Sequence, residues 1–541
     1  MASVSKKTRL LAAVAIPAIA ALALTGCNAG GGGGGNASGD NVILVGTTDK
    51  VTTLDPAGSY DNGSLAVQTQ VFPYLVNTDY NSNEVVPDLA ESAEFTSPSD
   101  YTVTLPKGLK WANGHDLTSS DVVFSFERNI AIADPNGASS LLYNLDSVEA
   151  TDDQTVVFHL LTENDQVFPF ILTSFPGAIV DEEVFSADAV TPDADIVKAN
   201  AFGGPYVITS YDFNQTVEFA PNPEYQGVIA PASNDGVVLT YFADSSNLKL
   251  AVQEGDVDVA YRTMSATDVA DLRTDDNVKV TDGPGGSIRY IVFNFDTQPY
   301  GAKTAEADPA KALAVRQAVA SLVDREAIAD QVYKGTYQPL YSYVPQGFAG
   351  ATTVLKDLYG DGDGGPDAAK AKEILEAAGV TTPVALSLQY SPDHYGPSSG
   401  DEYALVKDQL EADGLFAVDL KSTEWVQYSK DRTADVYPAY QLGWYPDYSD
   451  ADSYLTPFFL TKNFLGNHFS DQQTEDMILK QAVTPDVDER TQLIEDIQAR
   501  VAELLSTVPL LQGNELAVAG KGISGVTLDA SFKFRFAALT K

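Results

Sequence analysis

Short strand-like runs alternate with amphipathic helical runs along almost the whole chain, and this alternation most limits what the chain can fold into. The strand-like runs are rich in β-branched and aromatic residues and are bounded by turn residues. They cover 101–105, 155–160, 215–219, 237–242, 287–295 and 384–390. Helical periodicity lies between them, as in "DAAKAKEILEAAG" (367–379), where Gly379 stops the helix, and again within 484–508. The pattern favours α/β or α+β units and leaves their topology open.

The length and net charge of the chain indicate how many lobes it forms and which partners it disfavours. A chain of 541 residues is too long for one small core, so we expect two or more lobes. Its 33 basic and 75 acidic residues give a formal net charge of −42. Such a surface repels the phosphates of nucleic acids and the headgroups of anionic lipids, so we expect no nucleic-acid partner. It weakly favours cationic or zwitterionic ligands, although a solubilising acidic surface is the favoured explanation of the charge.

The first 27 residues have the pattern of an export signal. A basic stretch containing Lys6, Lys7 and Arg9 precedes an apolar run from Leu10 to Leu24, which is too short to span a bilayer comfortably. The closing "LTGC" resembles the lipobox of bacterial lipoproteins. This resemblance implies that Cys27 is lipidated and becomes the new N-terminus.

Cys27 is the only cysteine of the chain, so it forms no internal disulfide. The alternative is a secretory peptide that carries a cysteine near its cleavage site by chance. A Gly-rich tether follows over 28–40, and its composition predicts a flexible coil. We therefore expect an extracytoplasmic protein anchored to the bacterial cell membrane through lipidated Cys27.

Sequence signatures of catalysis and of metal binding are missing. The four histidines (115, 159, 394 and 468) share no metal-ligand spacing, and the chain has no P-loop, G-x-S-x-G or H-E-x-x-H motif. The segment "DGDGG" (361–365) lacks the ligand spacing of a calcium loop and reads better as a surface loop. We expect no cofactor, no metal and no enzymatic activity. A secreted hydrolase stays an alternative, because acidic pairs are plentiful in so acidic a chain.

Several segments in order resemble the family 5 extracellular solute-binding proteins, which are the peptide-, nickel- and oligosaccharide-binding components of ABC importers. The longest is "VVPDLAESAEFTSPSDYTVTLPKGLKWANGHDLTSSDVVFSFERNI" (85–130). The others lie at 201–227, 250–261, 291–300, 315–335, 368–379 and 443–455. The resemblance covers nearly everything from residue 41 to the C-terminus.

This resemblance implies a mixed α/β, periplasmic-binding-protein-like clamshell of the large three-domain type. Lobe I is expected to be discontinuous and to consist of 41–72, 200–292 and 501–541. An insertion domain is expected at 73–199, and lobe II at 293–500.

The resemblance also implies a ligand-binding site in the segment "GWYPDYSDADSYL" (443–455). In peptide-binding members, a Gly-Trp-x-x-Asp pattern places an aspartate in the cleft, where it pairs with the α-ammonium of the ligand. Here the pattern consists of Gly443, Trp444 and Asp447, and Tyr445 and Tyr448 would help to wall the cleft.

A purely structural interpretation of this segment is the alternative. Trp444 and Tyr448 would then be core residues, and the aspartates would cap or solvate the following helix. For Asp450 and Asp452 we prefer this structural interpretation.

Other site residues are less well defined by the resemblance. Tyr290 and Asn294 are candidates for the cleft, with strand packing as an equal alternative. Gln441 stands where some oligopeptide-binding members carry a basic residue. Arg289 and Arg432 are the nearest alternatives as a partner for the ligand carboxylate, although a surface role is favoured for each.

By resemblance, the expected function is the capture of short peptides by hinge closure and their delivery to ABC permease and ATPase subunits. We expect a monomer. An oligosaccharide ligand is the alternative within the same family, because aromatic rings and acidic acceptors also suit sugars.

Overall fold

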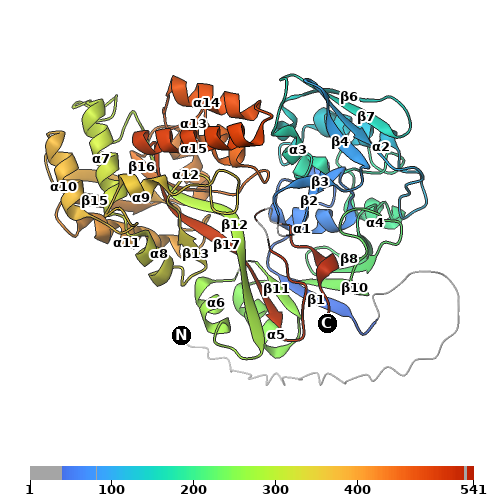
Figure 1. Ribbon diagram of the computed structural model, residues 1–541. Helices are drawn as coiled ribbons and strands as arrows, with labels where there is room; N and C mark the ends of the chain where they lie inside the picture. The colour runs from blue at the N-terminus through green and yellow to red at the C-terminus, as the bar shows by residue number, and fades with distance from the viewer. Residues whose placement is uncertain (1–38, 81, 263, 529, 531–532) are drawn as a thin grey trace, which may run out of the picture. The chain divides into compact units, whose positions relative to one another are not determined.

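The computed structural model describes residues 39–541 apart from 81, 263, 529, 531 and 532 (Figure 1). The expected signal peptide, its Cys27 and the tether up to residue 38 lie outside the described residues. Within the described part, no helix is both long and apolar enough to cross a membrane.

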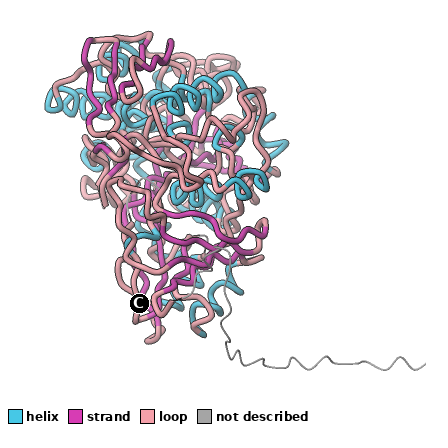
Figure 2. Tube along the Cα trace, turned by 90° about the vertical axis from the view of Figure 1, so that its right-hand side faces the viewer, coloured by secondary structure: helices cyan, strands magenta, loops and turns pink. Residues whose placement is uncertain are grey.

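Most strands belong to one mixed sheet of eleven strands, which Figure 2 shows in magenta among the cyan helices. Along the sheet the order is β15 (Phe416–Ser422), β14 (Val384–Tyr390), β16 (Ala439–Trp444), β12 (Val278–Phe293), β17 (Thr507–Gly520), β11 (Val259–Tyr261), β1 (Val42–Thr47), β10 (Gly236–Tyr241), β9 (Thr216–Pro221) and β8 (Tyr206–Asp212), with β13 (Tyr337–Pro339) also paired to β17.

Two smaller antiparallel sheets lie between β1 and β8 in the sequence. One has the order β4 (Ser92–Ser97), β5 (Asp100–Thr104), β7 (Thr155–Leu160) and β6 (Leu145–Ala150), and the other pairs β2 (Val76–Thr78) with β3 (Val85–Pro87).

The α-helices are α1 (Asn62–Val71), α2 (Ser119–Ile132), α3 (Phe168–Ile171), α4 (Asp193–Ala199), α5 (Ser245–Glu254), α6 (Ala266–Leu272), α7 (Pro309–Leu322), α8 (Arg325–Gln331), α9 (Val354–Leu358), α10 (Ala368–Ala377), α11 (Ser399–Glu411), α12 (Trp425–Thr433), α13 (Thr456–Phe459), α14 (Gln472–Ala482) and α15 (Val487–Leu504). Short 3₁₀ turns are η1 (Pro56–Gly58), η2 (Ser139–Leu142), η3 (Phe175–Gly177), η4 (Ala451–Tyr454) and η5 (Phe536–Ala538).

Local sequence accounts for several of these elements. The six predicted strand runs lie in β5, β7, β9, β10, β12 and β14, and the two predicted helices are α10 and α15. Helix α10 begins where the Asp367 side chain accepts the N–H of Lys370, and it ends just before Gly379, whose φ is +67°. The expectation of a mixed α/β fold is confirmed.

Strands β12 and β17 form a long antiparallel ribbon in the middle of the main sheet, between β15, β14 and β16 on one side and β11, β1, β10, β9 and β8 on the other (Figure 1). One half of the ribbon pairs with β11 through β17, and the other half pairs with β16 through β12. The pairing is irregular between Pro284 and Ile288. Close packing restricts this region, since a Cβ on Gly285 would lie 2.0 Å from the carbonyl oxygen of Gly513. The regular pairing of the ribbon is therefore interrupted at a Gly- and Pro-rich segment.

Buried apolar side chains form three large cores. One core contains residues from 288 to 511 and Ala530, and another contains residues from 43 to 261 and from 517 to 539. The third contains residues from 65 to 179, and Tyr448 packs into it from far along the sequence. The C-terminus returns to the start of β1, where the N–H of Lys541 donates to Asn41 (2.9 Å).

Candidate ligand-binding site

The predicted Gly-Trp-x-x-Asp segment leaves the sheet at the end of β16. This strand pairs with β12 in the register Trp444 to Ile288, and the chain then turns through 445–450 into η4. The Asp450 side chain caps η4 by accepting the N–H of Asp452 (2.8 Å). The loop that carries Asp447 is thus held between the end of a central strand and a capped turn.

Asp447 is a half-buried carboxylate with an unusual set of neighbours. The Tyr60 hydroxyl, which lies just before α1, donates a hydrogen bond to its Oδ1 atom. Its own backbone N–H donates to the Ser453 hydroxyl (3.0 Å). Burial raises the pKa of Asp447 to about 6, and the hydrogen bond from Tyr60 opposes this rise only in part. In the part of the chain that the structure describes, no lysine, arginine or histidine forms an ion pair with it.

A cavity of about 280 Å³ opens beside this carboxylate. Segments that are far apart in the sequence build it, and its lining residues are Tyr60, Asp61, Asn62, Phe175, His394, Tyr395, Trp425, Gly443, Trp444, Tyr445, Pro446, Asp447 and Phe464. Such a concave, largely aromatic site with a few polar groups is typical of small-ligand binding.

The aromatic rings of the cavity support one another in pairs. Tyr60 meets Phe175 edge to face, with ring centroids 4.8 Å apart. His394 stacks on Trp425 at 3.6 Å, and Trp444 meets Phe464 at 5.3 Å. Rings that are fixed in this way present rigid apolar area to a ligand.

Four of the predicted site residues line this cavity, namely Gly443, Trp444, Tyr445 and Asp447. The Trp444 indole N–H is buried and, among the described residues, has no hydrogen-bond acceptor. A buried donor without an acceptor is unfavourable, so a ligand or a water molecule that accepts from it would be stabilising. A Cβ on Gly443 would lie 2.9 Å from the Tyr395 ring, which explains why glycine stands there.

The other three predicted residues lie outside this cavity. Tyr448 is buried, lines a neighbouring cavity of about 20 Å³ that Asp447 also lines, and donates to Asp452 (2.8 Å). Tyr290 is buried and packs edge to face on Phe458, with ring centroids 5.5 Å apart. Asn294 is fully buried, and its amide donates to Asp435 (2.9 Å).

The structural interpretation of Asp450 and Asp452 is confirmed where it predicted helix capping, because Asp450 caps η4. It was wrong where it predicted exposure to solvent. Both side chains are buried. Asp450 caps η4 and also forms a two-pronged ion pair with Arg490 (2.6 and 2.9 Å). Asp452 accepts from Thr456 (2.7 Å) and from the amide of Gln481. Tertiary partners that lie far away in the sequence account for the burial.

The predicted surface role of Arg289 and Arg432 was wrong. Both are buried, with exposed fractions of 4% and 6%. Arg289 forms an ion pair with Glu402 (2.7 Å), and Arg432 donates to the carbonyl oxygen of Leu465 (3.1 Å). The guanidinium of each is thus engaged within the protein.

Most of the aromatic lining was missed in the sequence. Phe175, His394, Tyr395, Trp425 and Phe464 come from loops and element ends with no shared motif. Tyr60 was also missed, because no motif marks it in the sequence. Only their meeting in three dimensions identifies them.

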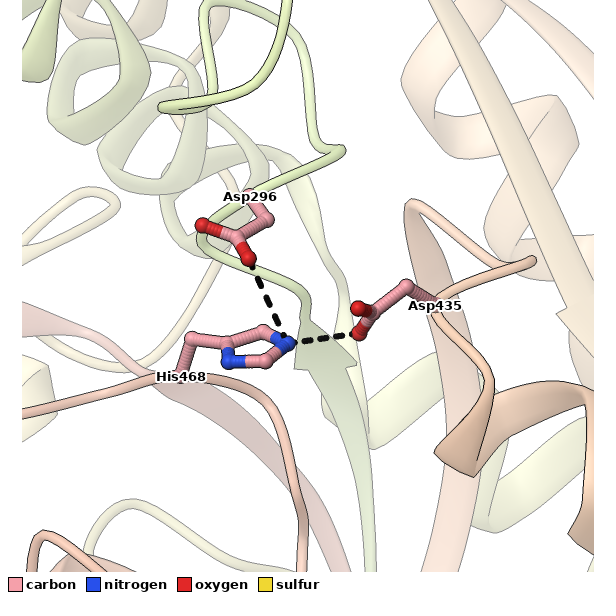
Figure 3. A group of neighbouring side chains, drawn as sticks. All are labelled: Asp296, Asp435 and His468. Atoms are coloured by element: carbon pink, nitrogen blue, oxygen red, sulfur yellow. Dashed lines mark hydrogen bonds and ion pairs between the residues drawn. The ribbon is translucent and has the colours of Figure 1, made fainter.

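Asp296, Asp435 and His468 form a group that could hold a cation (Figure 3). The His468 Nε2 atom lies 2.6 Å from Asp435 and 3.4 Å from Asp296. The ammonium of Lys303 already lies 2.8 Å from the Asp296 carboxylate, so the protein supplies its own counter-charge. The geometry is that of an ion-pair network that joins three loops.

The acidic glycine loop at 361–365 uses its first carboxylate internally. The Asp361 side chain accepts the backbone N–H groups of Asp363 (2.8 Å) and Gly365 (3.0 Å). These bonds lower the pKa of Asp361. The loop is thus stabilised by its own backbone.

Comparisons with known proteins identify similar chains and folds. The dipeptide-binding protein of Escherichia coli is 24% identical over 503 residues, which span 88% of this chain and 89% of that protein. The structure of HbpA2 from Haemophilus parasuis matches 92% of this chain and 99% of its own, with a TM-score of 0.79 and 20% identity. The DppA protein of Helicobacter pylori, solved with the peptide STSA, matches 92% of this chain and 98% of its own, with a TM-score of 0.71 and 20% identity.

These structural matches confirm the expected periplasmic-binding-protein-like α/β fold. The model of the bacterial extracellular solute-binding proteins, family 5 middle region, matches residues 84–466, which is more than half of the chain. The chain therefore belongs to family 5 of the bacterial extracellular solute-binding proteins.

Proposed function

We propose that this protein captures short peptides outside the cytoplasm and delivers them to the permease of an ABC importer, without catalysing a reaction on them. The observation that carries the proposal is the Asp447 carboxylate, which borders an aromatic cavity and has no ion-pair partner among the described residues. The names of the relatives from E. coli and H. pylori support a peptide as the ligand.

In this proposal the ligand ammonium completes the Asp447 site. A buried carboxylate is unfavourable unless a charge and hydrogen bonds compensate it. An incoming ammonium supplies both, and it would join the Tyr60 hydroxyl, which already donates to the carboxylate. Trp444 and Tyr445 would wall the ligand, whereas Tyr448, Tyr290 and Asn294 would act from the packing behind them.

We further propose that the units of the molecule follow the boundaries predicted from sequence. Lobe I would comprise 41–72, 200–292 and 501–541, with the insertion domain at 73–199 and lobe II at 293–500. The presence of separate buried cores supports a division into several units. The cores depart from these boundaries at 501–511, which packs with the proposed lobe II, and at 178–196, which packs with the proposed lobe I. The β12–β17 ribbon, irregular between Pro284 and Ile288, would be the hinge. Closure would bury a ligand between half-sites, and a permease could then recognise the closed form.

The proposed location rests on the first residues of the sequence. Cys27 would carry the lipid anchor and the chain would act as a monomer. Cys27→Ser should move the protein from the membrane fraction to the soluble extracytoplasmic fraction, as immunoblotting would detect. If the wild-type protein is itself found in the soluble fraction, the proposed anchor is wrong.

Thermal-shift and calorimetric titrations with a pool of short peptides test the function. We expect peptides with a free amine to stabilise the protein and their N-acetylated forms to fail. If no peptide binds, the peptide assignment fails. If acetylation makes no difference, a ligand without an essential amine, such as an oligosaccharide, is favoured instead.

A further inference from the structure

Exposed aromatic area is concentrated on the cavity beside Asp447. Tyr60, Tyr445 and Phe464 are 37%, 48% and 46% exposed, and all three line it. Large rings that remain this accessible without a ligand offer apolar area that an apolar group can cover. Their quadrupoles also favour a cation over the ring face.

The charged groups of the cavity have one sign. Asp61 and Asp447 are acidic, and no lysine or arginine belongs to the described lining. His394 stacks flat on Trp425, and burial lowers its pKa, so its ring is neutral at pH 7.5. The Asp61 carboxylate caps α1 by accepting from Thr52 and Ser64, so its charge lies near the cavity while its oxygens are engaged. A ligand in this cavity therefore meets acidic residues and no basic side chain of the described lining.

The basic residues nearby are engaged elsewhere. Arg289 is buried and pairs with Glu402. Arg432 is buried and donates to the carbonyl oxygens of Phe464 and Leu465, while its Nε atom has no hydrogen-bond partner among the described residues. Neither arginine belongs to the lining of the cavity. Arg262 packs over the ring of Tyr445 at 5.9 Å, but it pairs with Asp49 (2.8 Å) and lies 3.7 Å from Glu515. Its surroundings carry two carboxylates for one guanidinium, which disfavours a third.

Lys533 is the remaining basic residue close to Asp447. It lines the neighbouring cavity of about 20 Å³, which has room for about one water molecule. Its ammonium is buried and donates to Asn77 (2.8 Å). Lys533 does not belong to the described lining of the larger cavity.

We propose that the ligand is a peptide with an apolar or aromatic first residue whose terminal carboxylate is not recognised by any basic side chain, an inference that rests on the proposed peptide function. The ammonium binds Asp447, and the side chain of the first residue packs among the rings. The far end of the ligand is held only through contacts to the peptide backbone. C-terminal amides should therefore bind at least as tightly as free acids, because the amide removes repulsion from Asp61 and Asp447.

Matched peptide pools test this inference. A mixed dipeptide and tripeptide pool is prepared as free acids and as C-terminal amides, and each is titrated calorimetrically at pH 7.5. We expect the amidated pool to bind with equal or higher affinity, and the members retained after desalting to be enriched in aliphatic or aromatic first residues by mass spectrometry. A preference for free acids of more than about threefold would overturn the inference while leaving peptide binding intact. Failure of both pools would instead overturn the proposed function.

A pair of matched variants tests the aromatic part. Phe464→Ala removes an exposed ring from the cavity, whereas Phe213→Ala removes a 52% exposed ring from the β8–β9 turn. We expect the first variant to lose about tenfold in affinity for retained peptides with an aromatic first residue, and the second to bind like the wild type, since covering a ring contributes on the order of this ratio. Equal behaviour of the two variants would contradict the inference.

Discussion

Replacing Asp447 by asparagine should make the protein more stable and less able to bind. Without ligand, burial raises the pKa of this carboxyl from 3.8 to about 6. At about 1.4 kcal/mol per pKa unit, this corresponds to ~3 kcal/mol of unfavourable free energy for the ionised form in the folded protein. Because the folded pKa is the higher one, the penalty is full above pH 6 and disappears below pH 3.8.

Asp447→Asn removes this penalty while keeping the size of the side chain. We therefore expect a higher melting temperature for the ligand-free variant at pH 7.5, with a gain of about 1–3 kcal/mol because part of the bond from Tyr60 is lost. The affinity for a peptide with a free amine should fall at least about 30-fold, since removing one partner of a buried charge pair costs about 2–5 kcal/mol.

Scanning calorimetry and isothermal titration on the same preparations measure both effects. Asp450→Asn is the contrasting control, because Asp450 pairs with Arg490 outside the cavity. That variant should lose stability and keep its affinity when folded. Unchanged affinity together with an unchanged melting temperature in Asp447→Asn would refute the reasoning.

Three further predictions concern pH, a buried ion pair and the ribbon. Affinity for an amine-bearing peptide should fall about tenfold from pH 7.5 to pH 5, because protons compete for a carboxyl with a pKa of about 6, and Asp447→Asn should abolish this dependence in calorimetric titrations. Glu402→Gln should destabilise the fold by about 3–5 kcal/mol by leaving Arg289 buried without its partner, and a denaturation midpoint equal to that of the wild type would exclude a structural role for the pair. Gly285→Ala should cost about 1–3 kcal/mol because its Cβ would strike backbone, whereas Gly522→Ala, with open space around it, should unfold like the wild type.

Local patterns predicted much of the fold. Strand-like runs such as 155–160 and the helix at 368–377 carry their own periodicity, caps and stops, so their structure follows from neighbours in sequence. The joining of β12 to both β16 and β17 was not predictable in this way, because it pairs residues more than about 140 positions apart. Local sequence composition does not determine which distant strands pair or in which register.

The candidate site likewise contains residues that the sequence predicts and residues that only the tertiary structure reveals. Trp444, Tyr445 and Asp447 stand together in one motif, and the motif could be found in the sequence. Tyr60 reaches Asp447 across 387 residues, and its role depends entirely on tertiary structure. The burial of Arg289 was missed for the same reason, since its partner Glu402 lies 113 residues away. Charged residues far apart in sequence give no local sign that they will meet.

The most direct test is a crystal structure of the protein with a bound dipeptide that has a free amine. We predict that the ammonium nitrogen lies about 2.7–3.2 Å from a carboxylate oxygen of Asp447, with the first side chain between Tyr60 and Trp444. A dipeptide whose amine is bound elsewhere, with Asp447 left to Tyr60 alone, would contradict the proposed site.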